Sequence, residues 1–286
     1  MDNFYIIANS DKDEGLKIAS RVAGYIKSKG KNCYIRPAST GTRDNLHHYT
    51  DINQIPQEVE CVLVLGGDGT LLQAARDVVS RQIPLLGINL GTLGYLAEID
   101  SGSIEPALNH LMADEYTIEK RMMLNGKVYH RGKMVAEDVA LNDIVIGRDG
   151  PMGVTRFRNY INQEFLNAYA ADGIIISTAT GSTGYSLSAG GPIVSSETNI
   201  MLMTPISPHT LNTRSIIFPG EDEIGVEIAQ GTHRGNGKAV ASFDGDTNIA
   251  MNVGDRIVIR RSVKDTRIIK ISNISFLEVL RTKMRD

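Results

Sequence analysis

One short segment joins a glycine turn to a single carboxylate, a combination suited to phosphate chemistry. The run Leu63-Val64-Leu65-Gly66-Gly67-Asp68-Gly69-Thr70-Leu71-Leu72 predicts a buried strand, a tight turn and the start of a helix. Glycines let a ligand approach the backbone, and the free N–H groups of a helix N-terminus suit a phosphate. Asp68 would repel that phosphate unless its carboxylate binds a metal ion or accepts a proton. The segment therefore indicates phosphoryl transfer; a plain turn with a capping Asp is the alternative.

A second segment, residues 177–188, is dense in hydroxyl groups, and we name it the hydroxyl segment. Eight of its twelve residues carry a side-chain hydroxyl, and Gly181 and Gly184 lie between them. A core strand does not favour this composition, because each unpaired hydroxyl costs about 1–3 kcal/mol to bury. A rigid polar loop that presents hydrogen-bond donors to a sugar or phosphate explains the pattern better, with a Ser/Thr-rich surface loop as the alternative.

The N-terminal part of the chain predicts an α/β scaffold for the glycine turn. Strands are expected at 4–8, 33–35, 59–65 and 84–88, and helices at 13–29, 71–80 and 104–113, with Thr70 as the N-cap of the second helix. Strands that alternate with helices favour a parallel sheet, whose ligands bind beyond the carboxyl ends of its strands. The glycine turn and the loop 89–95 both follow such strand ends.

From residue 116 to residue 263 the pattern changes to short alternating strands separated by Gly, Asn and Asp turns. Examples are 124–128, 160–165, 224–228 and 256–259. This pattern of short strands and turns predicts a second, β-rich domain. We place the α/β domain at 1–100 and the β-rich, ligand-binding domain at 101–267, and expect the tail at about 268–286 to return to the first domain.

Composition excludes several classes of protein. A net charge of −3 over 286 residues implies no strong attraction to nucleic acid or to an anionic membrane. Cys33 and Cys61 lie in predicted strands without a ligand pattern nearby, which favours reduced, buried thiols in a cytoplasmic protein over a disulfide or a metal site. The chain shows neither a signal peptide nor a stretch of membrane-spanning length.

Together these motifs resemble the NAD kinase family over nearly the whole chain. The likeness rests on Gly66-Gly67-Asp68-Gly69-Thr70, Asn89-Leu90-Gly91-x-Leu93-Gly94-Tyr95, Asn142-Asp143, Thr178-x-Thr180-Gly181-Ser182-Thr183-x-Tyr185-Ser186-Leu187-Ser188-Ala189-Gly190-Gly191-Pro192 and Pro205-Ile206-Ser207-Pro208-His209-x-Leu211. The hydroxyl segment is the specific part, since lipid kinases and phosphofructokinases share the glycine–aspartate turn. This chain has Asp143, Ala179 and Gly184 where the family usually has Glu, Pro and Ala.

The resemblance implies a Rossmann-like α/β N-terminal domain, a β-sandwich C-terminal domain and an active site between them. It implies a kinase that transfers the terminal phosphate of ATP, with Mg²⁺ or another divalent metal, to the 2′-hydroxyl of the adenosine ribose of NAD, giving NADP. It also implies a homodimer or homotetramer, in which the NAD site often draws on a neighbouring subunit.

The same resemblance suggests roles for individual residues. Asp68 would accept the proton of the ribose hydroxyl, as the catalytic-loop aspartate of protein kinases does for its substrate. The backbone around Gly67, Gly69 and Thr70 would hold the ATP phosphates. The remaining predicted binding residues are Asn142 and Asp143 for the adenine or ribose, Asp172, Thr183, Gly184, Tyr185, Ser186, Leu187 and Ser188 for the nicotinamide half, Tyr95 and Tyr185 for ring contacts, and Asp246 in an Asp-Gly-x turn.

Other functions remain open at this stage. A lipid kinase of the diacylglycerol or sphingosine type shares the glycine turn, but gives the hydroxyl segment no obvious purpose. An NAD(P)-dependent oxidoreductase would carry Gly-x-Gly-x-x-Gly after the first strand, where this chain has Ala8-Asn9-Ser10. A non-catalytic dinucleotide sensor is a third alternative, which an activity assay separates from the kinase.

Overall fold

The chain forms two compact units, seen in a computed structural model that describes residues 1–35, 50–91, 94–97, 99–150, 154–209, 213–230, 237–272 and 274–284. Unit 1 comprises Met1–Arg121 and Lys264–Asp286, and unit 2 comprises Met122–Val263. Within the described ranges, every helix is too short or too polar to span a membrane.

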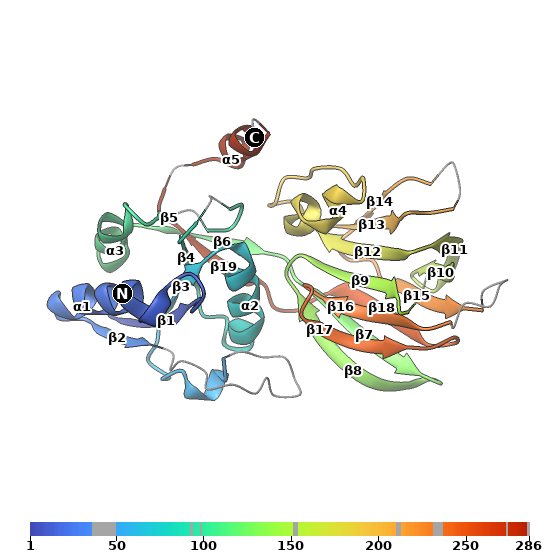
Figure 1. Cartoon of the computed structure of the whole chain (residues 1–286), viewed down its shortest axis with the longest axis horizontal. Coiled ribbons are helices and arrows are strands. Elements are labelled where there is room, and N and C mark those ends of the chain that lie inside the picture. The colour runs from blue at the N-terminus through green and yellow to red at the C-terminus, as the bar shows by residue number, and fades with distance from the viewer. Residues whose placement is uncertain are drawn as a thin grey trace. The chain divides into compact units, whose positions relative to one another are not determined.

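Unit 1 is a mainly parallel sheet with helices on both faces (Figure 1). Its strands are β1 (Asn3–Ala8), β2 (Asn32–Ile35), β3 (Cys61–Gly66), β4 (Leu85–Asn89), β5 (Ile99–Asp100), β6 (Thr117–Arg121) and β19 (Thr266–Lys270), and its helices are α1 (Lys17–Ser28), α2 (Asp68–Val78), α3 (Ile104–Met112) and α5 (Phe276–Lys283). The strand order is β2-β1-β3-β4-β19-β6, with β5 beside β4. Strands β1 to β4 are parallel, whereas β6 runs antiparallel to β19.

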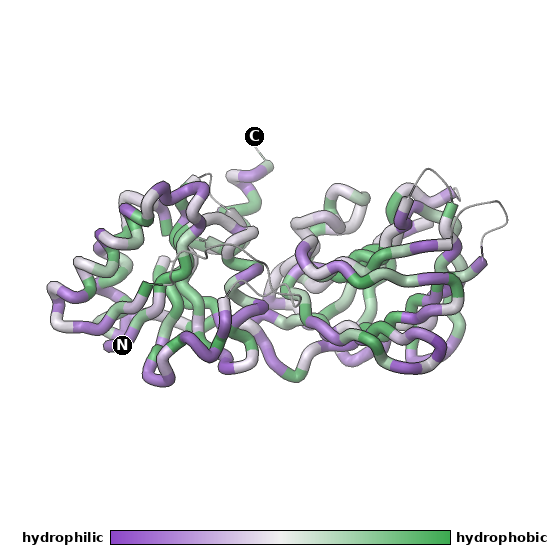
Figure 2. Tube along the Cα trace, turned by 60° about the horizontal axis from the view of Figure 1, so that its bottom comes forward, coloured by the Kyte–Doolittle hydropathy of each residue, from purple (hydrophilic) through white to green (hydrophobic). Residues whose placement is uncertain are grey.

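The helices of unit 1 lie on opposite faces of its sheet, because successive side chains of each buried strand point to alternate faces. Phe4 and Leu63 share one hydrophobic cluster with apolar residues of α1 and α3. Helix α2 contacts β3 and β4 and buries Leu71 and Ala75. The apolar stretches that build this core follow the strands (Figure 2). The chain therefore changes face between β1 and β3, which makes that position the topological switch point of the sheet.

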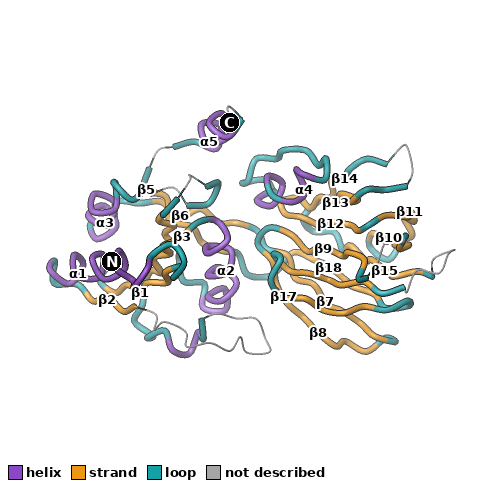
Figure 3. Tube along the Cα trace, in the orientation of Figure 1, coloured by secondary structure: helices purple, strands orange, loops and turns teal. Residues whose placement is uncertain are grey.

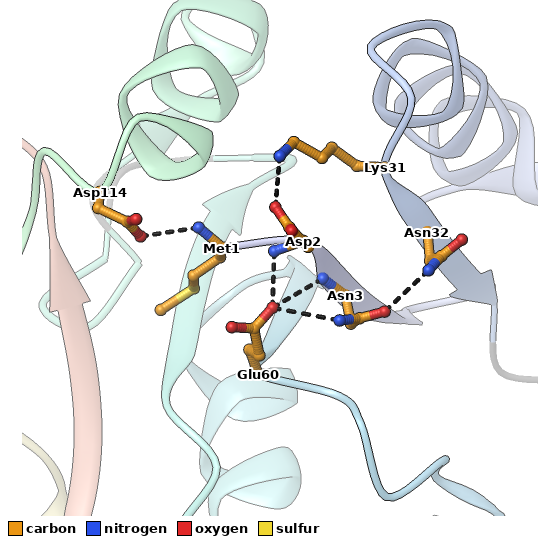
Figure 4. A network of polar contacts seen from close by, with 7 residues as sticks. All are labelled: Met1, Asp2, Asn3, Lys31, Asn32, Glu60 and Asp114. Carbon is orange, nitrogen blue, oxygen red and sulfur yellow. Dashed lines mark hydrogen bonds and ion pairs between the residues drawn. The ribbon is translucent and has the colours of Figure 1, made fainter.

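The start of β1 is fixed by a polar network at the amino ends of the parallel strands (Figure 4). One carboxylate oxygen of Glu60 accepts hydrogen bonds from the backbone N–H groups of Asp2 and Asn3, at 2.6 and 3.0 Å. The Asn32 side-chain amide donates to Asn3 at 2.9 Å, and Lys31 pairs with Asp2. These bonds link β1 to its neighbours on both sides and hold its register in the sheet.

Two helix starts differ from their predicted positions. Helix α2 begins at Asp68 with Gly67 as its N-cap, so the prediction of Thr70 as the cap was wrong. Leu71 N donates to Gly67 O at 3.1 Å, so the glycine turn already forms the first helical turn. Helix α1 begins at Lys17 rather than Asp13, because Gly15 and Leu16 adopt φ values of 68° and 53° and so interrupt the helix. The buried Asp13 carboxylate accepts from Ile18 N and Ala19 N in the first turn, both at 2.8 Å.

Unit 2 consists of two antiparallel sheets with little helix (Figure 3). Its strands are β7 (Leu124–His130), β8 (Lys133–Ala140), β9 (Asp143–Arg148), β10 (Thr155–Ile161), β11 (Glu164–Ala171), β12 (Gly173–Thr178), β13 (Ile200–Ile206), β14 (Ile216–Pro219), β15 (Ile224–Ala229), β16 (Ala239–Phe243), β17 (Thr247–Met251) and β18 (Arg256–Arg261), and its short helix is α4 (Tyr185–Ser188). The sheet orders are β11-β10-β15-β18-β7-β8 and β14-β13-β12-β9-β16-β17. Phe157 of the first sheet and Ile174 of the second belong to one buried cluster, so the sheets share a core as in a β-sandwich.

The structure differs from the sequence expectations in two further details. Helix α3 and strand β6, assigned from sequence to the second domain, lie in unit 1, because α3 packs into its core and β6 pairs with β19. The strand expected at 160–165 is instead the turn of the β10–β11 hairpin. Asn162 and Gln163 adopt φ values of 49° and 71°, as a tight hairpin turn requires.

Candidate active site

Asp68 stands at the N-terminus of α2, where the backbone of a neighbouring loop holds its carboxylate. Oδ2 accepts from Tyr95 N at 2.7 Å, and Oδ1 accepts from Leu96 N at 3.1 Å and Ala97 N at 3.3 Å. A Cβ added to Gly94 would lie 2.0 Å from Oδ1, so the loop approaches this closely only with glycine at that position. The carboxylate is thus fixed by three donors while one of its four acceptor positions stays open to a ligand.

The surroundings of Asp68 suit a phosphate-bearing ligand. The helix N-terminus directs N–H groups outward from the glycine turn, since only from Leu71 onward do they donate within the helix. Thr70 Oγ1 accepts from Asn9 Nδ2 at 3.2 Å, which ties this turn to the loop after β1. Burial and the charge of Asp68 raise the pKa of the Tyr95 phenol, so Tyr95 stays neutral beside the carboxylate.

In unit 2, Asn142 and Asp143 are positioned by a residue to which the sequence analysis gave no role. The Asp244 carboxylate accepts from three successive backbone N–H groups, those of Leu141 at 2.7 Å, Asn142 at 2.8 Å and Asp143 at 3.0 Å. Asp244 N donates in return to Asp143 O at 3.0 Å. The Asp-Gly-Asp turn was predicted as a ligand contact through Asp246, whereas its first aspartate clamps the start of β9. No sequence spacing signals this link, which spans about a hundred residues.

Asp143 is a buried carboxyl group without a hydrogen-bond donor among the described residues. Burial, and secondarily the charge of Asp244, raise its pKa from 3.8 to about 7. Ser177 of β12 pairs directly with Asp143 of β9, so both side chains lie on the same face of the sheet. Within the described part of the chain, the buried atoms Asn142 Oδ1 and Ser177 Oγ also have no partner. Unpartnered buried polar atoms are costly, so this cluster is suited to binding a polar ligand.

The hydroxyl segment divides into buried supports and accessible groups. Thr178 Oγ1 donates to Leu141 O at 2.7 Å, Ser182 Oγ contacts the backbone of Val194, and Ser186 Oγ hydrogen-bonds Thr204 Oγ1 at 3.1 Å. The predicted binding residue Ser186 is therefore fully buried against β13. The groups that remain accessible are Thr183, Gly184, Tyr185, Leu187 and Ser188.

Gly184 connects the accessible part of the hydroxyl segment to the polar cluster on β9. Its Cβ position lies 3.4 Å from Asn142 Nδ2 and 3.9 Å from Asp143 Oδ2. The structure therefore brings Asn142, Asp143 and Gly184 together, as the predicted dinucleotide site requires.

Asp172 lies away from this cluster. It precedes β12, while the hydroxyl segment leaves the other end of that strand, six residues and roughly 20 Å along. There its carboxylate pairs with Arg148 at 3.0 Å. Within one chain, Asp172 and the residues 183–188 are therefore not brought together. Of the motif residues quoted above, Leu93 and Leu211 lie outside the described residues.

Comparison with known sequence families decides what kind of protein carries these features. Residues 4–116 match the ATP-NAD kinase N-terminal domain, and residues 141–271 match the ATP-NAD kinase C-terminal domain. The chain belongs to the ATP-NAD kinase family. The predicted family and the predicted fold class are both confirmed. The family match also favours this family over the lipid kinases as the source of the glycine–aspartate turn.

Relatives named NAD kinase span the whole chain. The protein of Lachnospira eligens is 44% identical over 293 residues, which cover 99% of this chain and 100% of the relative. The protein of Agathobacter rectalis is 45% identical over 288 residues, covering 99% of each chain.

Two solved kinase structures have the same fold as this chain. The yeast NADH kinase complexed with NADH superposes with a TM-score of 0.89 at 24% identity, covering 100% of this chain and 88% of that one. An NAD kinase from Archaeoglobus fulgidus in complex with ATP gives 0.76 at 21% identity, covering 99% and 98%.

Proposed function

We propose that the chain is an NAD kinase, which transfers the terminal phosphate of ATP to the 2′-hydroxyl of the adenosine ribose of NAD and releases NADP and ADP. The observation that carries the proposal is the Asp68 carboxylate, held by three backbone N–H groups at a helix N-terminus in a chain of the ATP-NAD kinase family. The full-length relatives at 44–45% identity support the same assignment.

Asp68 acts as the general base in this proposal. As the ribose oxygen attacks the terminal phosphorus, the open acceptor position of the carboxylate takes the hydroxyl proton. The bond from that phosphorus to the bridging oxygen breaks, and ADP leaves with the electron pair. Because the loop 95–97 fixes the carboxylate, little reorganisation is needed when the proton moves.

Unit 2 supplies the dinucleotide-binding residues. Asn142 and Asp143 hold the adenine or its ribose, supported by the buried Asp143 carboxyl group and the buried Asn142 Oδ1, neither of which has a partner among the described residues. The accessible hydroxyls of Thr183 and Ser188 and the ring of Tyr185 bind the remaining part of NAD. Leu187 and Asp246 stay proposed members of the same site, whereas the buried Ser186, predicted as a binding residue, is proposed to support the segment through Thr204. Asp172 stays a proposed ligand of the nicotinamide half, and a second copy of the chain is needed if it is to reach that site.

A divalent metal enters this reaction as part of the ATP substrate. Mg²⁺ is usually held by one or two carboxylates together with the substrate phosphates. The one open position of the Asp68 carboxylate takes the ribose proton, so the metal would be held by the ATP phosphates themselves. The metal would neutralise charge on the phosphates during transfer.

The other expectations from sequence belong to the same proposal. Cys33 and Cys61 are both buried free thiols. Burial raises the pKa of Cys33 to about 11, so its thiol is inert at neutral pH. Inert reduced thiols support the predicted cytoplasmic location. The homodimeric or homotetrameric state stays a prediction.

An acceptor assay tests the function directly. Purified full-length chain is incubated with ATP and Mg²⁺ plus NAD, diacylglycerol or sphingosine, and NADP and phosphorylated lipid are measured. We expect ATP-dependent formation of NADP and no lipid product. Phosphorylation of a lipid without NADP would replace the proposal with the lipid-kinase alternative, and NAD binding without any product would favour a dinucleotide sensor.

A further inference from the structure

We propose that Lys12 is a phosphate-binding residue of this enzyme and that its ammonium group binds an oxygen of the ATP phosphates at the glycine turn. This inference rests on the proposed function, because it adds a residue to the same site. The sequence analysis gave Lys12 no role.

The sheet topology puts Lys12 where an α/β fold binds its ligands. Strands β1 and β3 are parallel neighbours, and their following helices lie on opposite faces. Ligands of such sheets bind in the crevice at this switch point, beyond the carboxyl ends of the strands. The loop after β1 carries Lys12, and the loop after β3 is the glycine turn with Asp68. Both loops therefore lie at the same edge of the sheet in unit 1, on either side of its switch point.

Hydrogen bonds fix the backbone of the Lys12 loop to the sheet. Asn9 N donates to Leu65 O at 2.9 Å, so the loop is tied to the end of β3. The Asn9 side chain accepts from Asp11 N at 2.9 Å and Lys12 N at 3.2 Å, and it donates to Thr70 at 3.2 Å. Asp13, which follows, is buried as the cap of α1. The position of Lys12 is thus set by the same residues that hold the glycine turn.

The Lys12 ammonium lies over two glycines that belong to different loops. Its Nζ is 2.9 Å from the position of a Cβ on Gly67 and 3.4 Å from that of a Cβ on Gly91. A side chain at position 67 would meet the ammonium, which would have to shift to make room. The ammonium therefore lies beside Gly67, the N-cap of α2.

The charge of Lys12 is available to a ligand. Among the described residues no carboxylate forms an ion pair with its ammonium, and the side chain is exposed. Asp68 places a negative charge beside the glycine turn, where an ATP phosphate would otherwise be repelled. A lysine is a compact point charge suited to phosphate oxygens, and it offsets this repulsion.

The Lys12 ammonium stabilises the transferred phosphate without gaining or losing a proton. The ribose oxygen forms the new bond to the terminal phosphorus, the bond to ADP breaks, and the proton passes to Asp68. Lys12 keeps its own protons and donates a hydrogen bond to a phosphate oxygen, where negative charge is held during transfer.

Substitution of Lys12 tests this role. Lys12→Met removes the charge and keeps the length of the side chain, and Lys12→Arg keeps the charge. Lys17→Met is the matched control, because Lys17 is an exposed lysine in the first turn of α1. We expect Lys12→Met to lower kcat/KM for ATP by about 10²-fold or more. KM for NAD and the thermal midpoint should stay at the wild-type values, Lys12→Arg should recover most of the activity, and Lys17→Met should match the wild type.

Calorimetric titration with ADP and Mg²⁺, and separately with NADP, identifies the phosphate concerned. Weaker binding of ADP by Lys12→Met, with unchanged binding of NADP, supports the proposal. Wild-type kcat/KM for ATP and wild-type ADP affinity in Lys12→Met would overturn it, as would an equal loss in Lys17→Met. Weakening of NADP binding alone would assign the ammonium to the product phosphate and would also overturn it. If the wild-type chain forms no NADP, the proposed function fails, and the ADP titration still tests Lys12.

Discussion

Asp68 differs from an ordinary helix-capping aspartate, because its carboxylate turns to a neighbouring loop. A cap would satisfy the first N–H groups of α2, whereas Asp68 accepts from Tyr95, Leu96 and Ala97. The N–H groups of the helix are left to a ligand, and the carboxylate is held beside them. The helix N–H groups are thus available to bind an anion, while the Asp68 carboxylate is available to accept a proton.

Replacing Asp68 by Asn tests the proton-accepting role. The amide oxygen can still accept hydrogen bonds from the loop, but it cannot take up the ribose proton. We expect the rate of NADP formation to fall by about 10²-fold or more, the usual contribution of a general base. NAD affinity and the thermal midpoint should stay close to those of the wild type. Near-normal turnover in this variant would refute the assignment.

Asp143 makes a distinct prediction about the pH dependence of stability. Its pKa is about 7 in the folded chain and 3.8 without burial, so between these values the folded state binds the extra proton. The free energy of unfolding therefore falls as pH rises from about 4 to 7. In Asp143→Asn this contribution is absent, and the fall should be smaller. Urea unfolding of both proteins at pH 5, 6, 7 and 8 measures the difference; identical pH profiles would contradict it.

At the scale of elements, some hydroxyls of the hydroxyl segment stabilise the fold and others are available for binding. The buried hydroxyls of Thr178 and Ser186 attach the segment to the loop between β8 and β9 and to β13, while Thr183 and Ser188 are accessible. Burial, rather than residue type, thus assigns each hydroxyl its role. The two groups cannot be told apart from the sequence, because both consist of serine and threonine.

A double substitution, Thr183→Ala with Ser188→Ala, tests this division. We expect weaker NAD binding, seen as a raised KM for NAD, with little change in thermal midpoint. The matched control is Ser186→Ala, which removes a buried hydrogen bond to Thr204 and should lower the thermal midpoint. Loss of folding in the double variant as large as its loss of binding would favour a purely structural role for the segment.

At the scale of the whole molecule, the edge strands of unit 2 carry exposed apolar side chains. Phe165 on β11, Met134 on β8 and Ile217 on β14 are each more than half exposed. Strands at the edge of a sheet with such side chains tend to pair with another chain. These edges support the predicted homodimer or homotetramer, in which a second copy could supply Asp172.

Light scattering on the purified chain measures its mass in solution. We expect a multiple of the 31.2 kDa protomer. Phe165→Glu should lower the mass, since it places a charge on an edge strand, whereas Ser20→Glu adds the same charge to an exposed position of α1 and should not. A single-protomer mass for the wild-type chain would contradict the oligomeric prediction.

The sequence by itself determined the family, the fold class and the two segments that could carry chemistry. Alternating strands and helices, the glycine–aspartate turn and the run of hydroxyls are local patterns, and local patterns report backbone conformation and residue chemistry directly. The start of α2 was predicted wrongly because a local pattern favours Thr70 as an N-cap. In the structure the Thr70 hydroxyl instead accepts a hydrogen bond from the distant Asn9.

Only the tertiary structure decided which polar groups are fixed, buried or free. The loop donors of Asp68, the clamp that Asp244 forms on Asn142 and Asp143, and the approach of Lys12 to two glycines all join residues distant in the chain. Strand order sets these contacts by bringing the carboxyl ends of β1, β3 and β4 to one edge and pairing β9 with β12. Such long-range pairings leave no spacing in the sequence, since they depend on the whole sheet rather than on any one segment.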